Sequence, residues 1–124
     1  MRIKRIIAVT LFGLAALPVS AQNILSNPGL CTADDGEQEL AGVAYLSATS
    51  VEAHWRACSW QTPLDYAPGL VAEVNAQCDG QDGPDTVRLQ IAVNGQGRVT
   101  IAGMDGSTGL PDYYFPCSRW GFKG

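Results

Sequence analysis

Apolar and polar residues alternate most regularly within Thr86–Met104. Branched apolar side chains occupy every second position in Val87–Val93 and again in Val99–Ile101. A period of two places one face of the chain in a core and the other in water, which is typical of a β-strand. Because a Gly-rich break separates the two runs, the pattern predicts an antiparallel hairpin.

The length of the hairpin loop decides which residues face each other, and opposed residues share one face of the sheet. A two-residue turn at 94–95 would set Ile91 opposite Arg98, an apolar against a charged side chain. A three-residue loop at 95–97 instead sets Ile91 opposite Ile101. We therefore predict the longer loop, with its last glycine in the left-handed conformation that such loops need.

A second alternating run precedes the hairpin. In Leu70–Cys78, apolar or small residues again occupy every second position, which predicts another strand. The run ends at Asp79–Asp85, where glycine and proline predict a long turn. Together with the hairpin, this strand predicts a three-stranded antiparallel meander at residues 70–104.

The segment Thr49–Trp60 fits two patterns. Thr49 followed by Glu52 matches a helix capping box, and three apolar residues then share one helical face: Val51, Trp55 and Cys58. Alternation over Val51–Ala57 would also suit a strand. Between these alternatives we favour a short helix.

The remaining segments are short. Thr32–Glu39 is acidic and contains glycine, which predicts a solvated loop, and Leu40–Leu46 predicts a short strand. Thr62–Gly69 contains two prolines and predicts a loop, and prolines in the tail Asp105–Gly124 discourage a long helix there. The predicted fold class is α+β, mainly antiparallel β, in a small disulfide-stabilised single domain.

The first 21 residues have the features of a signal peptide. A basic start precedes the apolar run Ile6–Leu17, and small residues at Val19 and Ala21 suit cleavage after Ala21. The run is shorter than the roughly 20 residues that a membrane-spanning helix needs. We predict a signal peptide at 1–21 and one globular domain at 22–124. That domain would be periplasmic or secreted, without a membrane span after cleavage.

The net charge of the chain indicates which classes of partner are favoured. The whole chain has a formal net charge of −4, with eight Lys and Arg against twelve Asp and Glu. Three of the basic residues lie in the predicted leader, so the exported part would keep five against twelve, a formal charge of −7. An acidic surface disfavours nucleic acid and anionic membranes and suits a basic protein partner.

The chain contains four cysteines, Cys31, Cys58, Cys78 and Cys117. An even number in an exported chain predicts two disulfides, and three connectivities are open. We favour Cys58–Cys78 with Cys31–Cys117, which would tie the N-terminal arm to the C-terminal tail. A zinc site is disfavoured because there is no Cys-x-x-Cys pair and a single histidine.

Acidic residues recur at every third position of the predicted long turn. Calcium loops of the helix–loop–helix type use ligands at alternate positions and a bidentate glutamate. Ordinary turn chemistry is therefore the preferred interpretation of these residues: Asp79, Asp82 and Asp85. We predict neither a metal site nor a cofactor.

His54 is the one histidine of the chain. A histidine can act as a general base near neutral pH, but a hydrolase also needs a nucleophile. The chain has no Gly-x-Ser-x-Gly elbow, and its cysteines are expected to be oxidised. We therefore assign no catalytic residue.

Large aromatic side chains form either the core or a binding platform. Besides Trp55, four aromatic residues are candidates for binding: Trp60, Tyr113, Tyr114 and Trp120. A small β domain needs large residues inside, so we expect three of these five in the core and one or two at a binding surface.

Residues 87–124 carry four motifs in order: Val87-Arg-Leu-Gln-Ile-Ala-Val, Gly97-Arg-Val, Ser107-Thr-Gly and Arg119-Trp-Gly-Phe-Lys. In this order they resemble the C-terminal domain of TonB-type energy transducers, with the hairpin and the Ser-x-Gly motif at matching offsets and a shorter stretch between Gly109 and Trp120. That family's Pro-rich segment is missing here. The resemblance therefore implies a periplasmic α+β domain that binds a protein partner by adding a strand at a sheet edge, without energy transduction.

The sequence favours a non-enzymatic periplasmic or secreted protein-binding module, of an inhibitor, immunity or TonB C-terminal-like kind. The second hypothesis is a carbohydrate- or cell-wall-binding module that uses the aromatic side chains. The third is a small hydrolase that uses His54.

Overall fold

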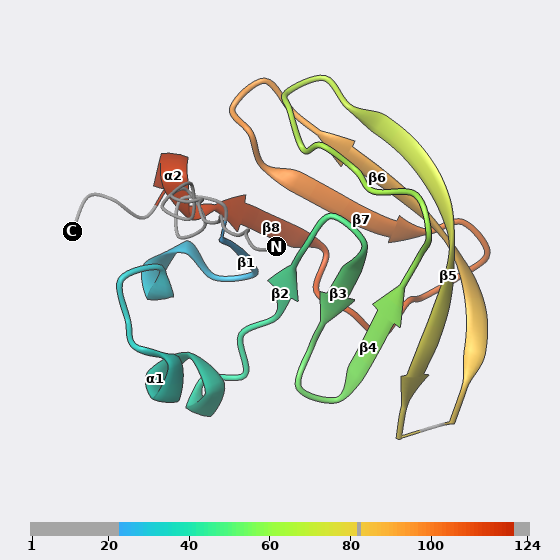
Figure 1. Ribbon diagram of the computed structural model, residues 1–124, viewed down its shortest axis with the longest axis horizontal. Coiled ribbons are helices and arrows are strands. Elements are labelled where there is room, and N and C mark those ends of the chain that lie inside the picture. Colours follow the sequence, from blue (N-terminus) through green and yellow to red (C-terminus); the bar gives the residue numbers. More distant parts are fainter. Residues whose placement is uncertain (1–22, 82, 121–124) are drawn as a thin grey trace, which may run out of the picture.

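Eight antiparallel strands form a closed barrel (Figure 1). The computed structural model describes residues 23–81 and 83–120, with only the main chain of Trp120, so the predicted signal peptide lies outside the described residues. Consecutive strands pair in chain order, and β1 also pairs with β8, which closes the barrel. The strands are β1 Ile24–Leu25, β2 Tyr45–Leu46, β3 Ser50–Glu52, β4 Arg56–Ser59, β5 Val71–Gly80, β6 Asp85–Val93, β7 Val99–Gly103 and β8 Tyr113–Pro116.

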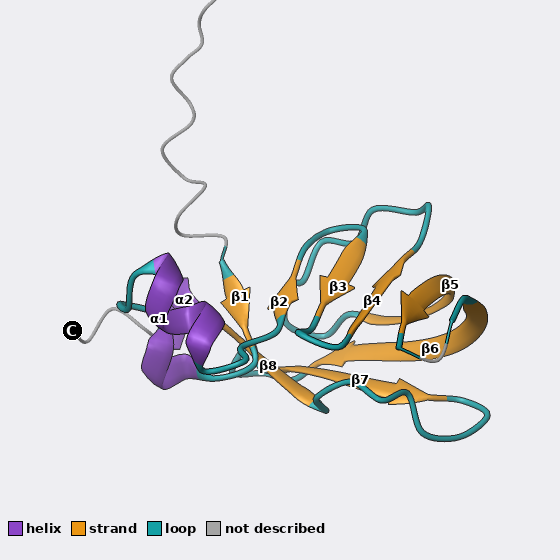
Figure 2. Ribbon diagram, turned by 90° about the horizontal axis from the view of Figure 1, so that it is seen from below, coloured by secondary structure: helices purple, strands orange, loops and turns teal. Residues whose placement is uncertain are grey.

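The helices are short and lie at one end of the barrel, away from the long β5–β6 hairpin (Figures 1 and 2). They are the 3₁₀ turn η2 Pro28–Leu30, α1 Asp35–Leu40 and α2 Cys117–Trp120. No helix in the described part of the chain has the length and apolar character needed to cross a membrane. The fold is therefore mostly antiparallel β, and its helices add no separate layer to the sheet.

The β6–β7 hairpin has the predicted register. Ile91 pairs with Ile101, and the loop at 95–97 ends with Gly97 at a φ of 89°. The side chain of Asn94 accepts two hydrogen bonds of 2.9 Å, one from the main-chain N–H of Gln96 within the loop and one from that of Arg98 just after it. These bonds satisfy donors that the turn leaves without a strand partner, so the local sequence itself stabilises the three-residue loop.

Side chains of alternate strand residues fill the barrel. Leu89, Ile91 and Ile101 are almost completely buried, as are Val99 and Tyr114. Burying an aliphatic side chain of this size stabilises the fold by about 1.5–3 kcal/mol. The alternation predicted for 70–78 is present in β5, where Val74, Ala76 and Cys78 are buried and the residues between them are exposed.

The helix predicted for Thr49–Trp60 is wrong, because this segment forms β3, a turn and β4. Val51 lies directly opposite Cys58, and both side chains are buried. The carbonyl of Thr49 accepts a hydrogen bond from the main-chain N–H of Trp60 instead of starting a helix. Pairing of β4 with β5 buries both strands' apolar faces, and that tertiary gain overrides the local capping signal.

Two shorter predictions also need correction. The predicted solvated loop at Thr32–Glu39 contains most of α1, because the side chain of Asp34 caps this helix by accepting a 2.8 Å hydrogen bond from the N–H of Glu37. The strand predicted within Leu40–Leu46 is limited to the two residues of β2. The loop predicted at Thr62–Gly69 is confirmed.

Two disulfides are present, with the favoured connectivity. Cys58–Cys78 joins directly opposed residues of β4 and β5. Cys31–Cys117 joins the residue after η2 to the first residue of α2, with a sequence separation of 86. The second bridge therefore ties the N-terminal arm to the tail beside the β1–β8 junction that closes the barrel.

Candidate functional site

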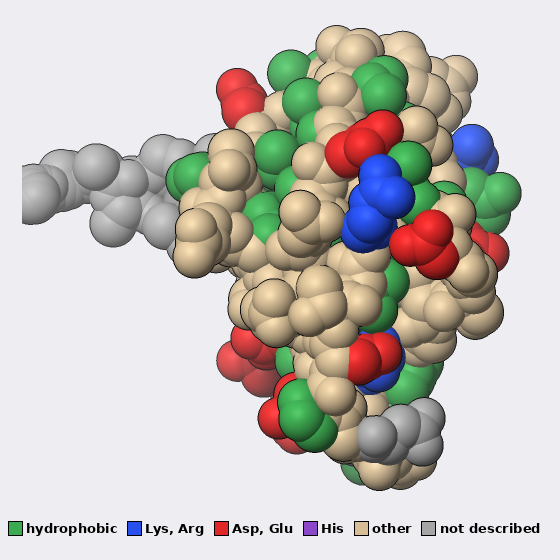
Figure 3. Space-filling view, turned by 90° about the vertical axis from the view of Figure 1, so that its right-hand side faces the viewer, with side chains coloured by type: hydrophobic (Ala, Val, Ile, Leu, Met, Phe, Trp, Pro, Cys, Tyr) green, Lys and Arg blue, Asp and Glu red, His purple; other side chains and the backbone are tan. Residues whose placement is uncertain are grey.

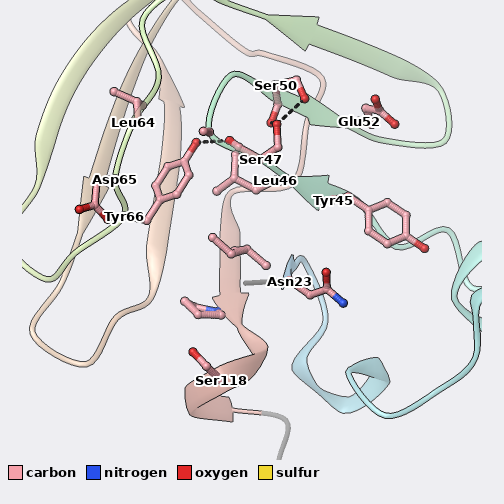
Figure 4. A pocket seen from close by; sticks show the side chains of 13 residues that line it. Asn23, Tyr45, Leu46, Ser47, Ser50, Glu52, Leu64, Asp65, Tyr66 and Ser118 are labelled. Atoms are coloured by element: carbon pink, nitrogen blue, oxygen red, sulfur yellow. Dashed lines mark hydrogen bonds between the residues drawn. The ribbon is translucent and has the colours of Figure 1, made fainter. Parts of the chain in front are cut away.

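A groove of about 540 Å³ lies where β1, β2 and β3 meet the loop at 64–66 and the C-terminal end of β8 (Figure 4). We call it the acidic groove. Its polar lining includes Tyr45, Ser47, Ser50, Glu52, Asp65 and Tyr66. Its volume lies within the range of about 300–1,000 Å³ that is usual for ligand sites.

The β2–β3 hairpin supplies one wall of the groove. Tyr45 pairs with Glu52, and Leu46 pairs with Val51. Because opposed residues share a face, the first pair points outward while the second pair is buried in the barrel. The short alternation of this hairpin thus places an aromatic ring and a carboxylate side by side at the surface.

Hydrogen bonds fix the loop at 64–66 against this hairpin. The Tyr66 hydroxyl donates a 2.6 Å hydrogen bond to the carbonyl of Ser47, whose own hydroxyl lies 2.7 Å from that of Ser50. Burial raises the pKa of Tyr66, so the phenol stays protonated and keeps donating. The groove is therefore held in place before any ligand arrives.

Helix α1 holds the side chain of Tyr45 in place. Its hydroxyl donates to the side-chain oxygen of Gln38 at 3.0 Å, and the amide of that buried glutamine donates to the carbonyl of Leu30 at 2.8 Å. The pKa of Tyr45 is raised by burial first and then by the negative charges of Asp35 and Glu39. Helix α1 thus both orients this ring and adds negative potential beside it.

The two carboxylates of the groove lack partners. Glu52 and Asp65 lie on opposite sides of the Ser47–Ser50 pair (Figure 4). Neither makes a side-chain hydrogen bond or an ion pair with any residue that the structure describes, and no Lys or Arg of residues 23–81 and 83–120 lines the groove. Their charges are therefore free to attract a cationic group.

Around β5 and β6, two ion pairs neutralise charges within the protein. Arg56 pairs with Asp85 at 2.9 Å and Arg88 with Glu73 at 3.5 Å. On the face shown in Figure 3, basic side chains lie against acidic ones. This contrast distinguishes the acidic groove from the charged surface around β5 and β6.

The four aromatic residues predicted to bind do not come together in this groove. Trp60 and Tyr114 are buried in the core, which corrects their assignment to a binding surface. Tyr113 is exposed and stacks on the guanidinium of Arg98, 4.4 Å from the ring centroid. The side chain of Trp120 lies outside the described residues.

Sequence reasoning missed the residues that do line the groove. Tyr45 lies in the short strand predicted within Leu40–Leu46, but the helix predicted for the next segment concealed its pairing with Glu52. The loop residues Asp65 and Tyr66 carry no such signal, because tertiary packing alone brings 64–66 onto the β2–β3 hairpin.

His54 lies exposed in the turn between β3 and β4 and forms no hydrogen bond with any described residue. Within residues 23–81 and 83–120, no group of three or more His, Cys, Asp or Glu side chains could hold a metal ion. Of the three aspartates of the long turn, Asp85 binds Arg56, Asp79 accepts a hydrogen bond from Gly80, and Asp82 lies outside the described residues.

Comparisons with known proteins give no relative: the chain matches no protein-family model, no curated protein and no solved structure.

Proposed function

We propose that this protein is a non-enzymatic binding module that acts outside the cytosol and holds a basic segment of a partner protein in the acidic groove. Two disulfides in so small a domain support an oxidising compartment, the periplasm or the extracellular space. The acidic balance of the chain supports a basic partner.

The observation that carries this proposal is the pair of carboxylates without a cation. Both line the groove: Glu52 is the strand partner of Tyr45, and Asp65 lies beside Tyr66 on the other side of the Ser47–Ser50 pair. A lysine or arginine from a partner would gain charge-assisted hydrogen bonds to the carboxylates. Its methylene groups would pack on Tyr45 and Tyr66.

Peptide display against the oxidised protein tests the proposal. Selected peptides should be enriched in Lys and Arg, and their affinity should fall as ionic strength rises. Glu52→Gln and Asp65→Asn should each weaken binding by roughly tenfold, the loss of about 1.4 kcal/mol. Asp105→Asn is the matched control, because it removes the same charge at an exposed position outside the groove.

Two results would refute the proposal. One is a selection that returns no binding peptide with the groove intact; the other is equal binding of the selected peptides to Glu52→Gln and Asp105→Asn. Equal binding to both variants would show that net charge, rather than the groove, attracts the ligand.

A second mode of protein binding is favoured by the edge of β5. β4 pairs with β5 only at residues 77–80, so residues 71–76 have β6 as their one strand neighbour among the described residues. A hollow of about 550 Å³ separates this edge from Ser59–Thr62. The resemblance of residues 87–124 to TonB-type C-terminal domains implies strand addition at a sheet edge, and we propose the open edge of β5 as that place.

A proline substitution distinguishes this mode. The N–H of Val93 donates to the carbonyl of Leu70, so even-numbered residues of β5 bond to β6 and odd-numbered residues face the open side. Asn75→Pro should therefore block strand addition while leaving the barrel intact, and Asn75→Ala should bind normally. Equal partner binding by the two variants would exclude this mode.

A further inference from the structure

Trp55 lies in the turn between β3 and β4 with 42% of its surface exposed. Its indole N–H donates a hydrogen bond to the carbonyl of Gly109, which is 54 residues away in the chain. An exposed ring with a fixed polar atom loses little conformational freedom when a ligand stacks on it. Trp55 does not line the acidic groove, so the ring takes no part in the protein binding proposed there.

Two glycines allow the chain to close around Trp55. A Cβ atom at Gly80 would lie 2.5 Å from the main-chain oxygen of Trp55, so only glycine permits this approach of β5 to the turn. Gly109 has a φ of +76°, and a Cβ atom there would lie 3.3 Å from the side chain of Arg56. Close backbone packing at Gly80 and Gly109 therefore fixes the position of the indole.

The neighbours of Trp55 are polar but carry no net charge. Arg56, whose side chain is 12% exposed, donates two hydrogen bonds from one nitrogen to the carboxylate of Asp85, at 2.9 and 3.2 Å. Gln81 and Ser107 are exposed beside this pair and offer an amide and a hydroxyl. Together with Trp55 they border a hollow of about 330 Å³.

We propose that this hollow binds a neutral sugar unit, with one face of the pyranose ring stacked on Trp55. The hydroxyls of a sugar match donors and acceptors such as those of Gln81 and Ser107, and its C–H face matches the apolar indole. The Arg56–Asp85 ion pair disfavours an ionic ligand, because each charge already has a partner of opposite sign. We call this hollow the Trp55 site.

A protein interface fits these surroundings less well. Interface tryptophans act as hot spots when a ring of contacts around them excludes water. Here the hollow is concave, small and bordered by polar groups, which suits a hydroxyl-rich ligand.

Affinity gel electrophoresis of the oxidised protein in gels that contain soluble neutral polysaccharides tests the proposal, with a glycan array to widen the set of sugars. At least one neutral glycan should retard the native protein. Trp55→Ala should lower that affinity by about tenfold or more, and Trp55→Phe, which keeps a ring but loses the N–H, should retain part of it. Tyr113→Ala, the loss of another exposed aromatic ring, should bind as the native protein does.

Three results would overturn the Trp55 site: no retardation by any neutral glycan, binding unchanged in Trp55→Ala, or equal losses in Trp55→Ala and Tyr113→Ala. A melting temperature near the native value for Trp55→Phe shows that a loss of binding does not reflect unfolding. Glu52→Gln should leave glycan binding unchanged, so failure of this proposal and failure of the acidic groove are separate outcomes.

Discussion

At the scale of single residues, three tyrosines differ in what their hydroxyls contact. Tyr66 donates to the carbonyl of Ser47, and Tyr45 donates to the side chain of Gln38. The hydroxyl of Tyr114 is buried in the barrel and has no hydrogen-bond partner among the described residues. The first two hydroxyls shape the acidic groove, whereas the third opposes the stability of the core.

Removing the hydroxyl of Tyr114 should therefore not harm the protein. A buried hydroxyl without a partner costs about 1–3 kcal/mol, so Tyr114→Phe should keep or raise the melting temperature. Tyr66→Phe is the contrasting change: it loses a hydrogen bond worth about 1 kcal/mol and should lower the melting temperature by roughly 4–8 °C. A clear fall in Tyr114→Phe would show that its hydroxyl is satisfied in solution.

Alkaline pH should destabilise the fold through the same side chains. Burial raises the pKa of Tyr66, and burial together with Asp112 raises that of Tyr114. The unfolded chain loses these protons near pH 10 while the folded chain retains them. The contribution of these two tyrosines to the free energy of unfolding is therefore fully present below pH 10 and is lost as pH rises further.

Urea unfolding between pH 8 and pH 11.5 measures this loss. The native protein should show a falling midpoint above pH 10, and the Tyr66→Phe/Tyr114→Phe double variant should show a shallower fall. If the urea midpoints of the two proteins fell equally with pH, the loss of stability would not come from Tyr66 and Tyr114.

At the scale of elements, the hairpin β6–β7 and the strand β5 could be predicted, whereas β3 and β4 could not. The hairpin is specified locally by alternation over Val87–Ile101 and by the turn residues at 94–97. The segment Thr49–Trp60 carries both helix and strand signals, of which we favour the helix from sequence alone, and the pairing of β4 with β5 decides for the strand. That pairing depends on residues about twenty positions away, which no local pattern reports.

The pairing of β1 with β8 closes the barrel, and we expect its stability to depend on the Cys31–Cys117 disulfide. Only two residue pairs join these strands, beside the Cys31–Cys117 bridge. For a closed loop of this length, a disulfide contributes about 4–5 kcal/mol by restricting the unfolded chain.

Removing that bridge should open the barrel at this junction. In Cys31→Ala/Cys117→Ala, hydrogen exchange should accelerate at Ile24 and Leu25 far more than at the β5–β6 pairs. Uniform acceleration in all strands would show instead that the barrel unfolds as a single unit.

At the scale of the whole molecule, the disulfides and the mostly β character were within reach of the sequence, but barrel closure was not. β1 and β2 have two residues each, too few to show a period. The acidic groove could not be predicted from the sequence either. It is formed by the two-residue strand β2 and by the loop at 64–66, which a tertiary hydrogen bond holds in place. The Trp55 site likewise depends on contacts between distant turns.

The most direct test of the account is a map of where a selected basic peptide binds. Two-dimensional ¹H–¹⁵N spectra of the oxidised protein, recorded during titration with the tightest display peptide, would give that map. The largest shifts should fall on Tyr45–Glu52 and on residues 64–66, and Glu52→Gln should reduce them. Shifts that avoid both segments, or that persist unchanged in Glu52→Gln, would contradict the central claim that the acidic groove binds a basic segment of a partner.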